Sequence, residues 1–327
     1  MKSFIPLLGI IMMAASSCGD SSLTRTLPNI TGASGEVLVV MNKTLWEGKG
    51  GEAAREDLAA ILVGMPQPEP AFDLLHVNPE GFKDVYQAHR NILIAEIIPG
   101  TDEADLTVTE NRWAESQIVL RLTAPDTTEL VNALHRYAPV IRERIDNAER
   151  ERLTLWLAKS AGKEKAEVSS GDKKLEILMP AGYKPDFSRE GLLMISAETP
   201  ATTQSVIVSY SDPMIATIGC IELADLTEKI TSVEVKGPDG GSFMVIEKKV
   251  PVSCRSFKRN NTEYIEMRGL WTLEGGYMGG PFISYAYVDP EALKIVVVIG
   301  FVYAPKNEKR ELLRQVEALM YSVRKVS

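Results

Sequence analysis

The chain has 327 residues, of which 45% are apolar and 24% are charged, and these fractions are those of an ordinary globular protein. Its formal net charge is −8 at pH 7, which argues against nucleic acid as a partner because nucleic-acid binding needs a basic face. The chain that remains after removal of an N-terminal signal, about 300 residues, is long enough for two domains.

The N-terminus has the organisation of a secretory signal. Lys2 precedes an apolar run over residues 4–15, and small residues follow that run up to Cys18. A cysteine directly after small residues resembles the lipobox of bacterial lipoproteins, in which the thiol is lipidated and the chain is cut just before it. The apolar run is too short to span a membrane, which takes about 20 residues. We therefore predict a signal peptide over residues 1–17 and lipid attachment at Cys18, with an ordinary secreted protein as the alternative.

The residues after the signal indicate where the protein is anchored. Residues 18–34 are rich in Ser, Thr, Gly and Asn, which predicts a flexible tether between the lipid and the folded chain. In bacterial lipoproteins, an Asp directly after the lipidated cysteine resembles an inner-membrane retention signal. This chain has Gly19 at that position, which favours the outer membrane. A run of acidic residues after the cysteine resembles a signal for export to the cell surface. Here only Asp20 is acidic close to the cysteine. We expect the protein to be held in the outer membrane by its lipid, on the periplasmic face, with the cell surface as the alternative.

The first half of the chain has its own core-forming pattern. Residues 36–41 are rich in β-branched residues and predict a buried strand, and residues 52–63 place apolar residues on one helix face. Three prolines within residues 65–72 predict a stiff, non-helical connector. Asp126 or Thr127 can cap a long amphipathic helix. Further strands are predicted at residues 73–77, 91–97, 106–109 and 117–123.

The second half repeats this theme after a change in composition. Residues 161–173 are mostly small or charged and lack apolar periodicity, so we predict that they form a linker. A helix is predicted within residues 222–231, and a second one with an apolar stripe over residues 307–323. Strands are predicted at residues 175–179, 192–197, 204–210, 243–250, 263–273, 282–288 and 294–302.

These elements predict an α+β protein of two helix-on-antiparallel-sheet sandwich domains, over residues 35–160 and 174–327. Besides Cys18, the chain contains Cys220 and Cys254. A secreted compartment permits a disulfide between these two, and a pair of buried free thiols is the alternative.

We find no catalytic, cofactor-binding or metal-binding pattern in the sequence. None of the three histidines stands in a metal-ligand spacing, and no Gly-x-Ser-x-Gly nucleophile motif occurs. His89 and Arg90, followed by Asn91, could supply a base, an ion-pair partner and a cap, or they could form a structural loop. We therefore predict no cofactor and no metal, and leave enzymatic activity open.

Three other side chains are candidates for contact with a ligand. Glu69 lies between two prolines and is the one acid with a rigid position. Arg268 lies in a strand pattern three residues before Trp271, and a cation there must find a partner or water. One interpretation is a buried structural ion pair. The other is a ligand carboxylate or sugar held by Arg268 and stacked on Trp271.

Several motifs are spread over the mature chain, namely Leu45-Trp46, residues 66–70, His89-Arg90-Asn91, Trp113 with Gln117, residues 268–271, 279–282 and 301–305, and the helix over residues 309–318. Their combination resembles a family of Bacteroidota lipoproteins with a domain of unknown function, and the resemblance covers nearly the whole mature chain. It implies a bacterial envelope lipoprotein and gives no activity, ligand or catalytic residue. The order of elements in the C-terminal half is also similar to the PsbP/Mog1-like sandwich.

Three functions remain open at this point. The first is a non-enzymatic envelope lipoprotein that binds a partner protein or stabilises an assembly at the outer membrane. The second is a binding module for a small ligand, glycan or lipid, with its site between the two domains. The third is a hydrolase that uses carboxylates, with Glu69 as the candidate.

Overall fold

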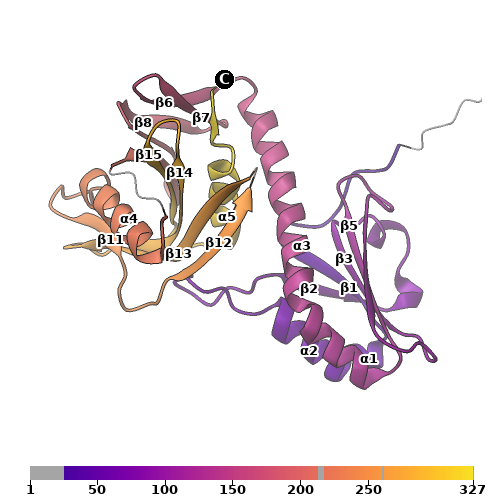
Figure 1. The fold of residues 1–327 in the computed structure, drawn as a ribbon. Coiled ribbons are helices and arrows are strands. Elements are labelled where there is room, and N and C mark those ends of the chain that lie inside the picture. Colours follow the sequence, from indigo (N-terminus) through magenta and orange to yellow (C-terminus); the bar gives the residue numbers. More distant parts are fainter. Residues whose placement is uncertain (1–25, 213–216, 260, 327) are drawn as a thin grey trace, which may run out of the picture.

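The computed structural model of the protein describes residues 26–212, 217–259 and 261–326 (Figure 1). The predicted signal peptide, Cys18 and the start of the predicted tether lie outside these residues. The end of that tether is fixed to the first domain, since Thr31 N donates to Ala88 O at 2.8 Å and Glu115 N donates to Pro28 O at 2.9 Å. The prediction of a flexible tether is therefore wrong for this part of the chain, because backbone hydrogen bonds hold it in place.

The first domain is built on a five-stranded sheet with the strand order β2-β1-β3-β5-β4. Neighbouring strands in the row β2-β1-β3-β5 run parallel, and only β4 pairs antiparallel, with β5. The strands are β1 (Glu36–Val40), β2 (Asp73–Val77), β3 (Asn91–Ile97), β4 (Asp105–Glu110) and β5 (Ile118–Ala124).

The prediction of an antiparallel sheet is wrong for this domain. Parallel neighbours need a crossover, and α1 (Lys43–Glu47) and α2 (Lys49–Leu58) provide the one between β1 and β2. Two 3₁₀ turns, Pro79–Gly81 and Asp84–Tyr86, lie in the connection from β2 to β3. Parallel strands are buried on both faces, which explains why the apolar run of β1 is continuous rather than alternating.

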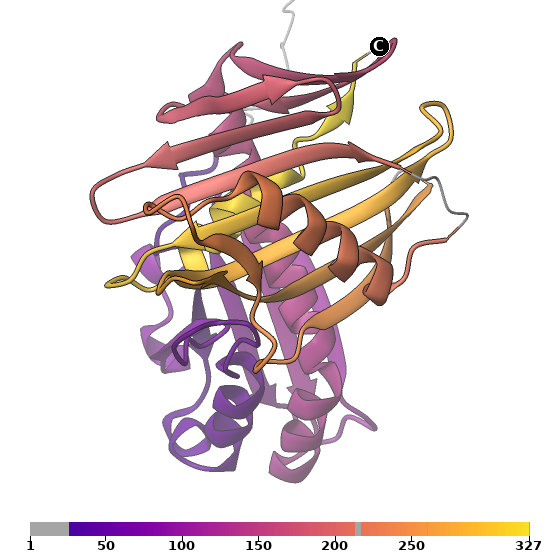
Figure 2. The ribbon, with the colours of Figure 1, turned by 90° about the vertical axis from the view of Figure 1, so that its left-hand side faces the viewer.

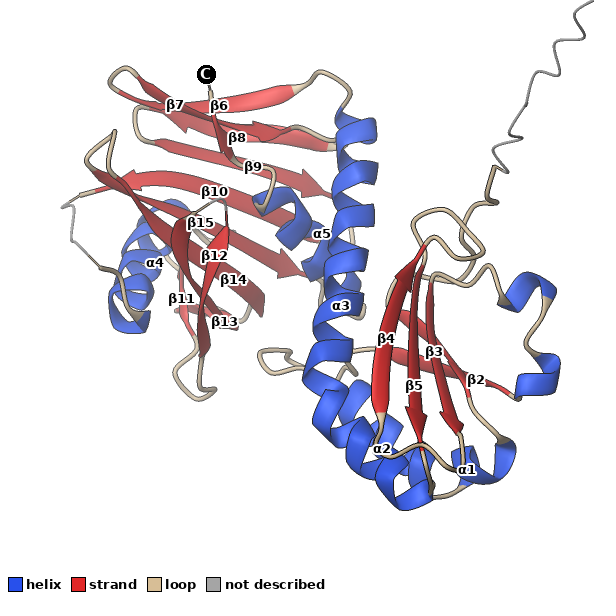
Figure 3. Cartoon of the chain, turned by 45° about the vertical axis from the view of Figure 1, so that its right-hand side comes forward, coloured by secondary structure: helices blue, strands red, loops and turns tan. Residues whose placement is uncertain are grey.

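Helix α3 (Thr127–Ala161) is 35 residues long and belongs to both domains (Figures 1 and 3). The Asp126 side chain caps it as predicted, accepting a hydrogen bond from Glu129 N at 2.9 Å. Leu130 and Ile141 on its first half are buried against the first sheet, whereas Leu157 near its end is buried in the core of the second domain. The helix therefore joins the two domains directly. Within the described ranges, no helix combines the length and the apolar character needed to cross a bilayer.

The segment predicted as a linker is regular structure. After α3 ends, β6 (Lys165–Ser170) and β7 (Lys173–Leu178) form an antiparallel hairpin that turns at Gly171, where φ is +61°. Ala166 and Val168 are buried while their neighbours are exposed, so the segment does alternate. The linker prediction is wrong because the high charge of the exposed face hides this two-residue period.

The second domain contains an antiparallel sheet of eight strands. Seven of them follow the order β11-β13-β14-β15-β10-β9-β8, and β12 pairs with β13 beside this row. A smaller sheet joins β6 and β7 to β16 (Arg324–Lys325). The strands of the large sheet are β8 (Tyr183–Arg189), β9 (Leu192–Glu198), β10 (Thr203–Ser211), β11 (Phe243–Ile246), β12 (Ser253–Arg259), β13 (Thr262–Glu274), β14 (Gly279–Asp289) and β15 (Lys294–Tyr303).

Helices cover both faces of this sheet, as Figure 2 shows with α4 in front of the strands and α3 behind them. On one face, α4 (Cys220–Glu234) packs over a core that includes Trp271 and Phe282. On the other, α5 (Arg310–Met320) and the end of α3 pack over a core that includes Tyr285. The prediction of an α+β fold is confirmed, but this sheet is covered on two sides rather than one.

The alternative left open for the cysteines is resolved in favour of a disulfide. Cys220, the first residue of α4, is bonded to Cys254 in β12, and the two residues are 34 positions apart in the sequence. The bond ties the helix on one face of the sheet to the edge strand beside β13.

Candidate functional site

Glu69 holds the start of α5 against the first domain. It is only 3% exposed, and its carboxylate accepts hydrogen bonds from Lys309 N at 2.9 Å and from Arg310 N at 2.7 Å. A carboxylate at the N-terminus of a helix satisfies free amides and complements the helix dipole. The structure therefore gives the predicted rigid acid a capping role between two domains.

Arg90 belongs to a buried polar cluster around Glu149 of α3. Glu149 is 1% exposed and accepts from Arg90 Nη2 at 2.6 Å and from Asn91 Nδ2 at 2.7 Å. Arg152 lies 3.0 Å from the same carboxylate and also donates to Arg90 O. These contacts fix α3 to the start of β3, so the structural-loop interpretation of this motif fits the observed geometry.

His89 is 5% exposed, and its Nδ1 lies 3.1 Å from Asn91 O. Burial lowers the pKa of His89, and the contacts with Asn91 and Glu36 oppose this only in part. Burial therefore disfavours the protonated ring, which contacts the loop around Gly32 and lies 3.4 Å from the Glu36 carboxylate inside the first domain.

Arg268 and Trp271 cannot hold one ligand together. They are three residues apart in β13, and side chains alternate along a strand, so the two point to opposite faces of the sheet. Trp271 is 3% exposed and donates from Nε1 to Val302 O at 3.2 Å within the core under α4. The predicted clamp is wrong, and its alternative, a structural ion pair of Arg268, is observed: the two partner carboxylates are buried and the Arg268 side chain is 30% exposed.

Arg268 is the centre of a cation–carboxylate cluster. Its Nε donates to Glu266 at 2.8 Å and its Nη2 donates to Glu317 of α5 at 2.6 Å. Arg255 from β12 also binds Glu266, at 2.9 and 3.1 Å, and Arg150 from α3 binds Glu317 at 3.1 Å. Burial disfavours ionisation of Glu266, but Arg268 and Arg255 outweigh it and lower the pKa of this carboxyl to about 2.

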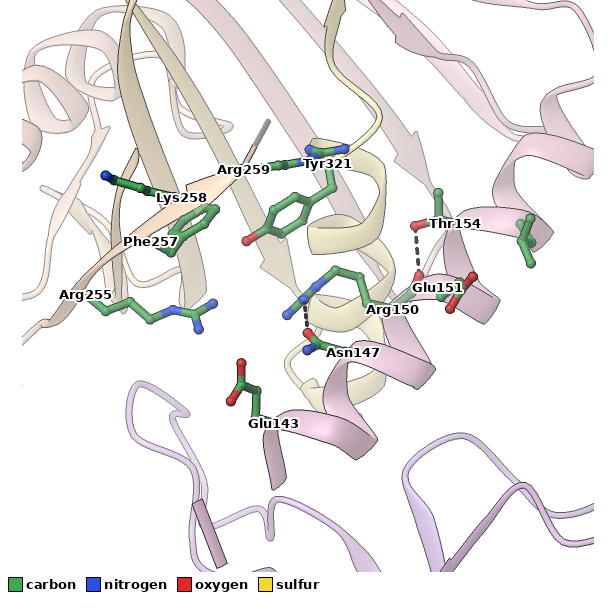
Figure 4. Close-up of a pocket in the computed structure, with 11 residues that line it drawn as sticks. Glu143, Asn147, Arg150, Glu151, Thr154, Arg255, Phe257, Lys258, Arg259 and Tyr321 are labelled. Carbon is green, nitrogen blue, oxygen red and sulfur yellow. Dashed lines mark hydrogen bonds between the residues drawn. The ribbon is translucent and has the colours of Figure 1, made fainter. Parts of the chain in front are cut away.

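A cleft of about 470 Å³ opens beside this cluster, between one side of α3 and strand β12 (Figure 4). We call it the α3–β12 cleft. Its walls carry Arg150 and Asn147 on the helix side, and Arg255, Phe257 and Arg259 on the strand side. The remaining lining residues are Glu143, Glu151, Thr154, Leu155, Lys258 and Tyr321.

A second cavity of about 460 Å³ adjoins the first and reaches the loop over residues 60–65 of the first domain. The two share Glu143, Asn147, Arg150 and Arg255. Eight cationic side chains line the pair, namely Arg142, Arg150, Arg255, Lys258, Arg259, Arg268, Arg310 and Arg314. Five carboxylates line it, namely Glu143, Asp146, Glu149, Glu151 and Glu317.

Cations therefore outnumber carboxylates in the lining itself, although the whole chain has a formal charge of −8. Glu266, Asp73 and Glu311 lie outside the lining and pair with some of these cations. Burial raises the pKa of Asp146, which lines the second cavity, and Arg314 opposes this only in part. A local excess of positive charge in an acidic protein attracts anions into the cleft.

Arginines and aromatic rings lie together at the mouth of the α3–β12 cleft. The guanidinium carbons of Arg150 and Arg259 lie 4.9 and 5.2 Å from the centre of the Tyr321 ring. Arg255 lies 5.5 Å from the ring centre of Phe257, and the two rings are 6.1 Å apart. Three cations thus meet around one pair of rings, in the arrangement of a cation–π cluster.

Sequence reasoning missed this cleft, although part of its signal is local. Residues 255, 257 and 259 alternate along β12, so Arg255, Phe257 and Arg259 share one face of the strand. A basic run with an interleaved aromatic residue could have been recognised as a binding surface. The opposite wall comes from α3, more than 100 positions earlier, and the sequence carries no sign of that contact.

The arrangement suits the binding of an anion better than proton transfer. Guanidinium groups stay protonated and donate hydrogen bonds to carboxylates and phosphates. Tyr321 donates to Glu266 at 3.1 Å, and burial raises its pKa, so it stays a neutral donor. Among the residues that the structure describes, no group of three or more metal-ligating side chains comes together.

The fold and this cleft define a two-domain α+β protein in which one long helix joins a mostly parallel sheet to a larger antiparallel sheet. By sequence, the chain belongs to the family of the domain of unknown function DUF4837, whose model matches residues 143–322. A second domain of unknown function, DUF8532, matches residues 31–156, so the two matches overlap within α3. The predicted resemblance to a family with a domain of unknown function is confirmed, and its lipoprotein character stays a prediction.

Comparison with solved structures finds similarity over about half of the chain. The Ran-binding protein Mog1p of Saccharomyces cerevisiae matches with 11% identity and a TM-score of 0.31, covering 49% of this chain and 95% of that one. A point mutant of the protein Mog1 matches with 12% identity and a TM-score of 0.29, with the same coverage. A search of curated protein sequences gave no significant match.

Proposed function

We propose that this protein is a non-enzymatic binding protein of the bacterial cell envelope, held by a lipid at Cys18, and that it binds its ligand in the α3–β12 cleft. The observation that carries the proposal is the excess of cations around an open cleft in a protein of net negative charge. Of the sequence hypotheses, this geometry favours a ligand-binding module.

The state of the candidate catalytic residues supports binding over hydrolysis. Both carboxylate oxygens of Glu69 accept backbone hydrogen bonds at the start of α5, so this acid has no orientation toward a substrate. His89 is buried against its own loop. General acid–base catalysis needs a titrating group within hydrogen-bond reach of the substrate, and the arginines that face the cleft do not titrate near neutral pH.

The envelope location is supported by the N-terminal sequence and by the cysteines. The signal-like start, the small residues before Cys18 and the polar segment after it fit a secreted, lipidated chain. A disulfide between Cys220 and Cys254 persists in oxidising compartments and is rare in the cytosol.

Native mass spectrometry of the full-length protein, purified from cell envelopes in detergent, tests this function. We expect wild-type protein to carry a non-covalent small molecule that the Arg259→Ser variant loses. Arg189→Ser is the matched control, because Arg189 also lies over an aromatic ring, Phe187, but does not line the α3–β12 cleft. Wild-type protein without a small ligand, crosslinked instead to one envelope protein, would contradict the proposal and favour an assembly role.

A further inference from the structure

We propose that the ligand of the α3–β12 cleft carries a phosphate group, bound by Arg150, Arg255 and Arg259. This inference rests on the proposed binding function and specifies the chemistry of the ligand. Three features of the cleft carry it: the positions of the cations, their unbalanced charge and the rings beside them.

The donors reach the cleft from two walls. Arg150 comes from α3, whereas Arg255 and Arg259 come from β12. Figure 4 shows Arg150 and Arg255 pointing toward each other beside Tyr321, with Arg259 over the ring of Tyr321. A carboxylate offers two oxygens in one plane, which can accept from more than one guanidinium, as Glu266 does. A phosphate offers oxygens in three directions, so donors from two walls can bind it at once.

The local carboxylates do not balance these cations. The cleft and the ion-pair cluster beside it contain four carboxylates, Glu143, Glu151, Glu266 and Glu317, against five cations, Arg150, Arg255, Lys258, Arg259 and Arg268. Arg259 makes no ion pair with any residue that the structure describes and rests against Tyr321 instead. A phosphate monoester carries a charge of about −1.5 to −2 at pH 7, which would compensate this surplus.

Arg150 supplies a further unused donor. Its Nη1 and Nη2 bind Asn147 and Glu317, but its Nε–H is buried and has no hydrogen-bond partner among the described residues. Because the Nε atom is closed to solvent, a ligand in the cleft would be bound by the second N–H of Nη1 or Nη2, which these two contacts leave free.

The walls also indicate what the phosphate is attached to. Phe257, Tyr321 and the 59% exposed Leu155 give the cleft apolar surface next to its cations. A bare phosphate ion would leave this surface in contact with water, whereas a phosphate ester would place its sugar or hydrocarbon part against it. A lipid headgroup and a soluble phosphate ester share this chemistry.

Thermal denaturation of the full-length protein in detergent, at constant ionic strength, tests the inference with defined probes. We expect glucose 1-phosphate to raise Tm more than citrate or acetate does. Arg259→Ser should weaken the apparent affinity for glucose 1-phosphate about tenfold, whereas Arg189→Ser should not change it. Arg259 is chosen because it makes no buried ion pair, so the variant should keep the wild-type Tm without ligand.

Citrate that stabilises as strongly as glucose 1-phosphate, or a response that survives Arg259→Ser, would overturn the phosphate assignment. The binding function would still stand if Arg259→Ser lost the molecule that copurifies with wild-type protein, so the two failures are distinguishable. Native mass spectrometry with soluble, short-chain phosphatidic acid, against phosphatidylcholine of the same chain length, separates the sources without interference from the lipid at Cys18. Competition by glucose 1-phosphate would place the lipid phosphate in the cleft, and binding of the soluble ester alone would assign a soluble ligand.

Discussion

Replacement of Arg268 by leucine should destabilise the protein strongly at neutral pH. Arg268 donates to two carboxylates, Glu266 and Glu317, whose side chains are 1% and 8% exposed. Removing one partner of a buried ion pair typically costs about 3–5 kcal/mol, and the loss here should lie at the lower end, about 3 kcal/mol, because Arg255 still pairs with Glu266 and Arg150 still pairs with Glu317. We expect Arg268→Leu to lower the free energy of unfolding by this amount at pH 7.5.

The effect should depend on pH in a defined direction. In the wild-type protein the pKa of Glu266 is lowered from 4.5 to about 2, so its ionised form stabilises the fold above pH 4.5 and this contribution is lost as the pH falls toward 2. That shift corresponds to about 3 kcal/mol. Without Arg268 the pKa values of both glutamates rise, so the variant gains protons and loses less stability near pH 4 than at pH 7.5.

Urea unfolding followed by circular dichroism at the two pH values measures this difference. Arg255→Met is the control, since Arg255 is 53% exposed and its removal leaves Glu266 paired with Arg268. We expect this control to cost about 1 kcal/mol. A loss in Arg268→Leu that is equal at both pH values, or no larger than in Arg255→Met, would refute the assignment of the cluster as a buried ionic network.

Three other changes test the contacts between elements. Glu69→Ala removes the acceptor at the start of α5 and should lower the free energy of unfolding by about 2 kcal/mol in the same assay. A loss below about 0.5 kcal/mol would contradict the capping role of Glu69. Glu149→Gln leaves Arg90 and Arg152 without their buried counter-charge and should lower the free energy of unfolding by about 3 kcal/mol. An unchanged free energy of unfolding would show that α3 is held by its apolar contacts alone. The disulfide between Cys220 and Cys254 closes a span of 34 residues, and its reduction should lower the free energy of unfolding by about 3 kcal/mol. An unchanged urea midpoint after complete reduction would contradict this expectation.

Much of the secondary structure could be predicted because it depends on local pattern. The long helix with Asp126 as its cap, the final amphipathic helix and the apolar strands of the second sheet all lie where their periodicity placed them. The strands that were missed are polar edge strands such as β8 and β12, whose faces are mostly exposed. A strand that buries little apolar surface leaves little period-two signal.

Strand pairing could not be predicted in the same way. The continuous apolar run of β1 was recognised as a buried strand, but only the helical crossover to β2 shows that its neighbours are parallel. The case of Arg268 and Trp271 is different, because their separation of three residues along one strand already places them on opposite faces. That constraint was available in the sequence, and it excludes the predicted clamp without any knowledge of the fold.

The position of the cleft within the chain separates the roles of the two domains. Every residue that lines the α3–β12 cleft lies between Glu143 and Tyr321, and the DUF4837 family match covers residues 143–322. The adjoining cavity, in contrast, also needs residues 60–65 of the first domain. The cation cluster and its rings therefore belong to the DUF4837 unit, and the first domain closes only the cavity beside them. Glu69 of the first domain holds the start of α5, and α5 carries Glu317 of the ion-pair cluster. We therefore infer that the first domain acts on the α3–β12 cleft through the position of this helix.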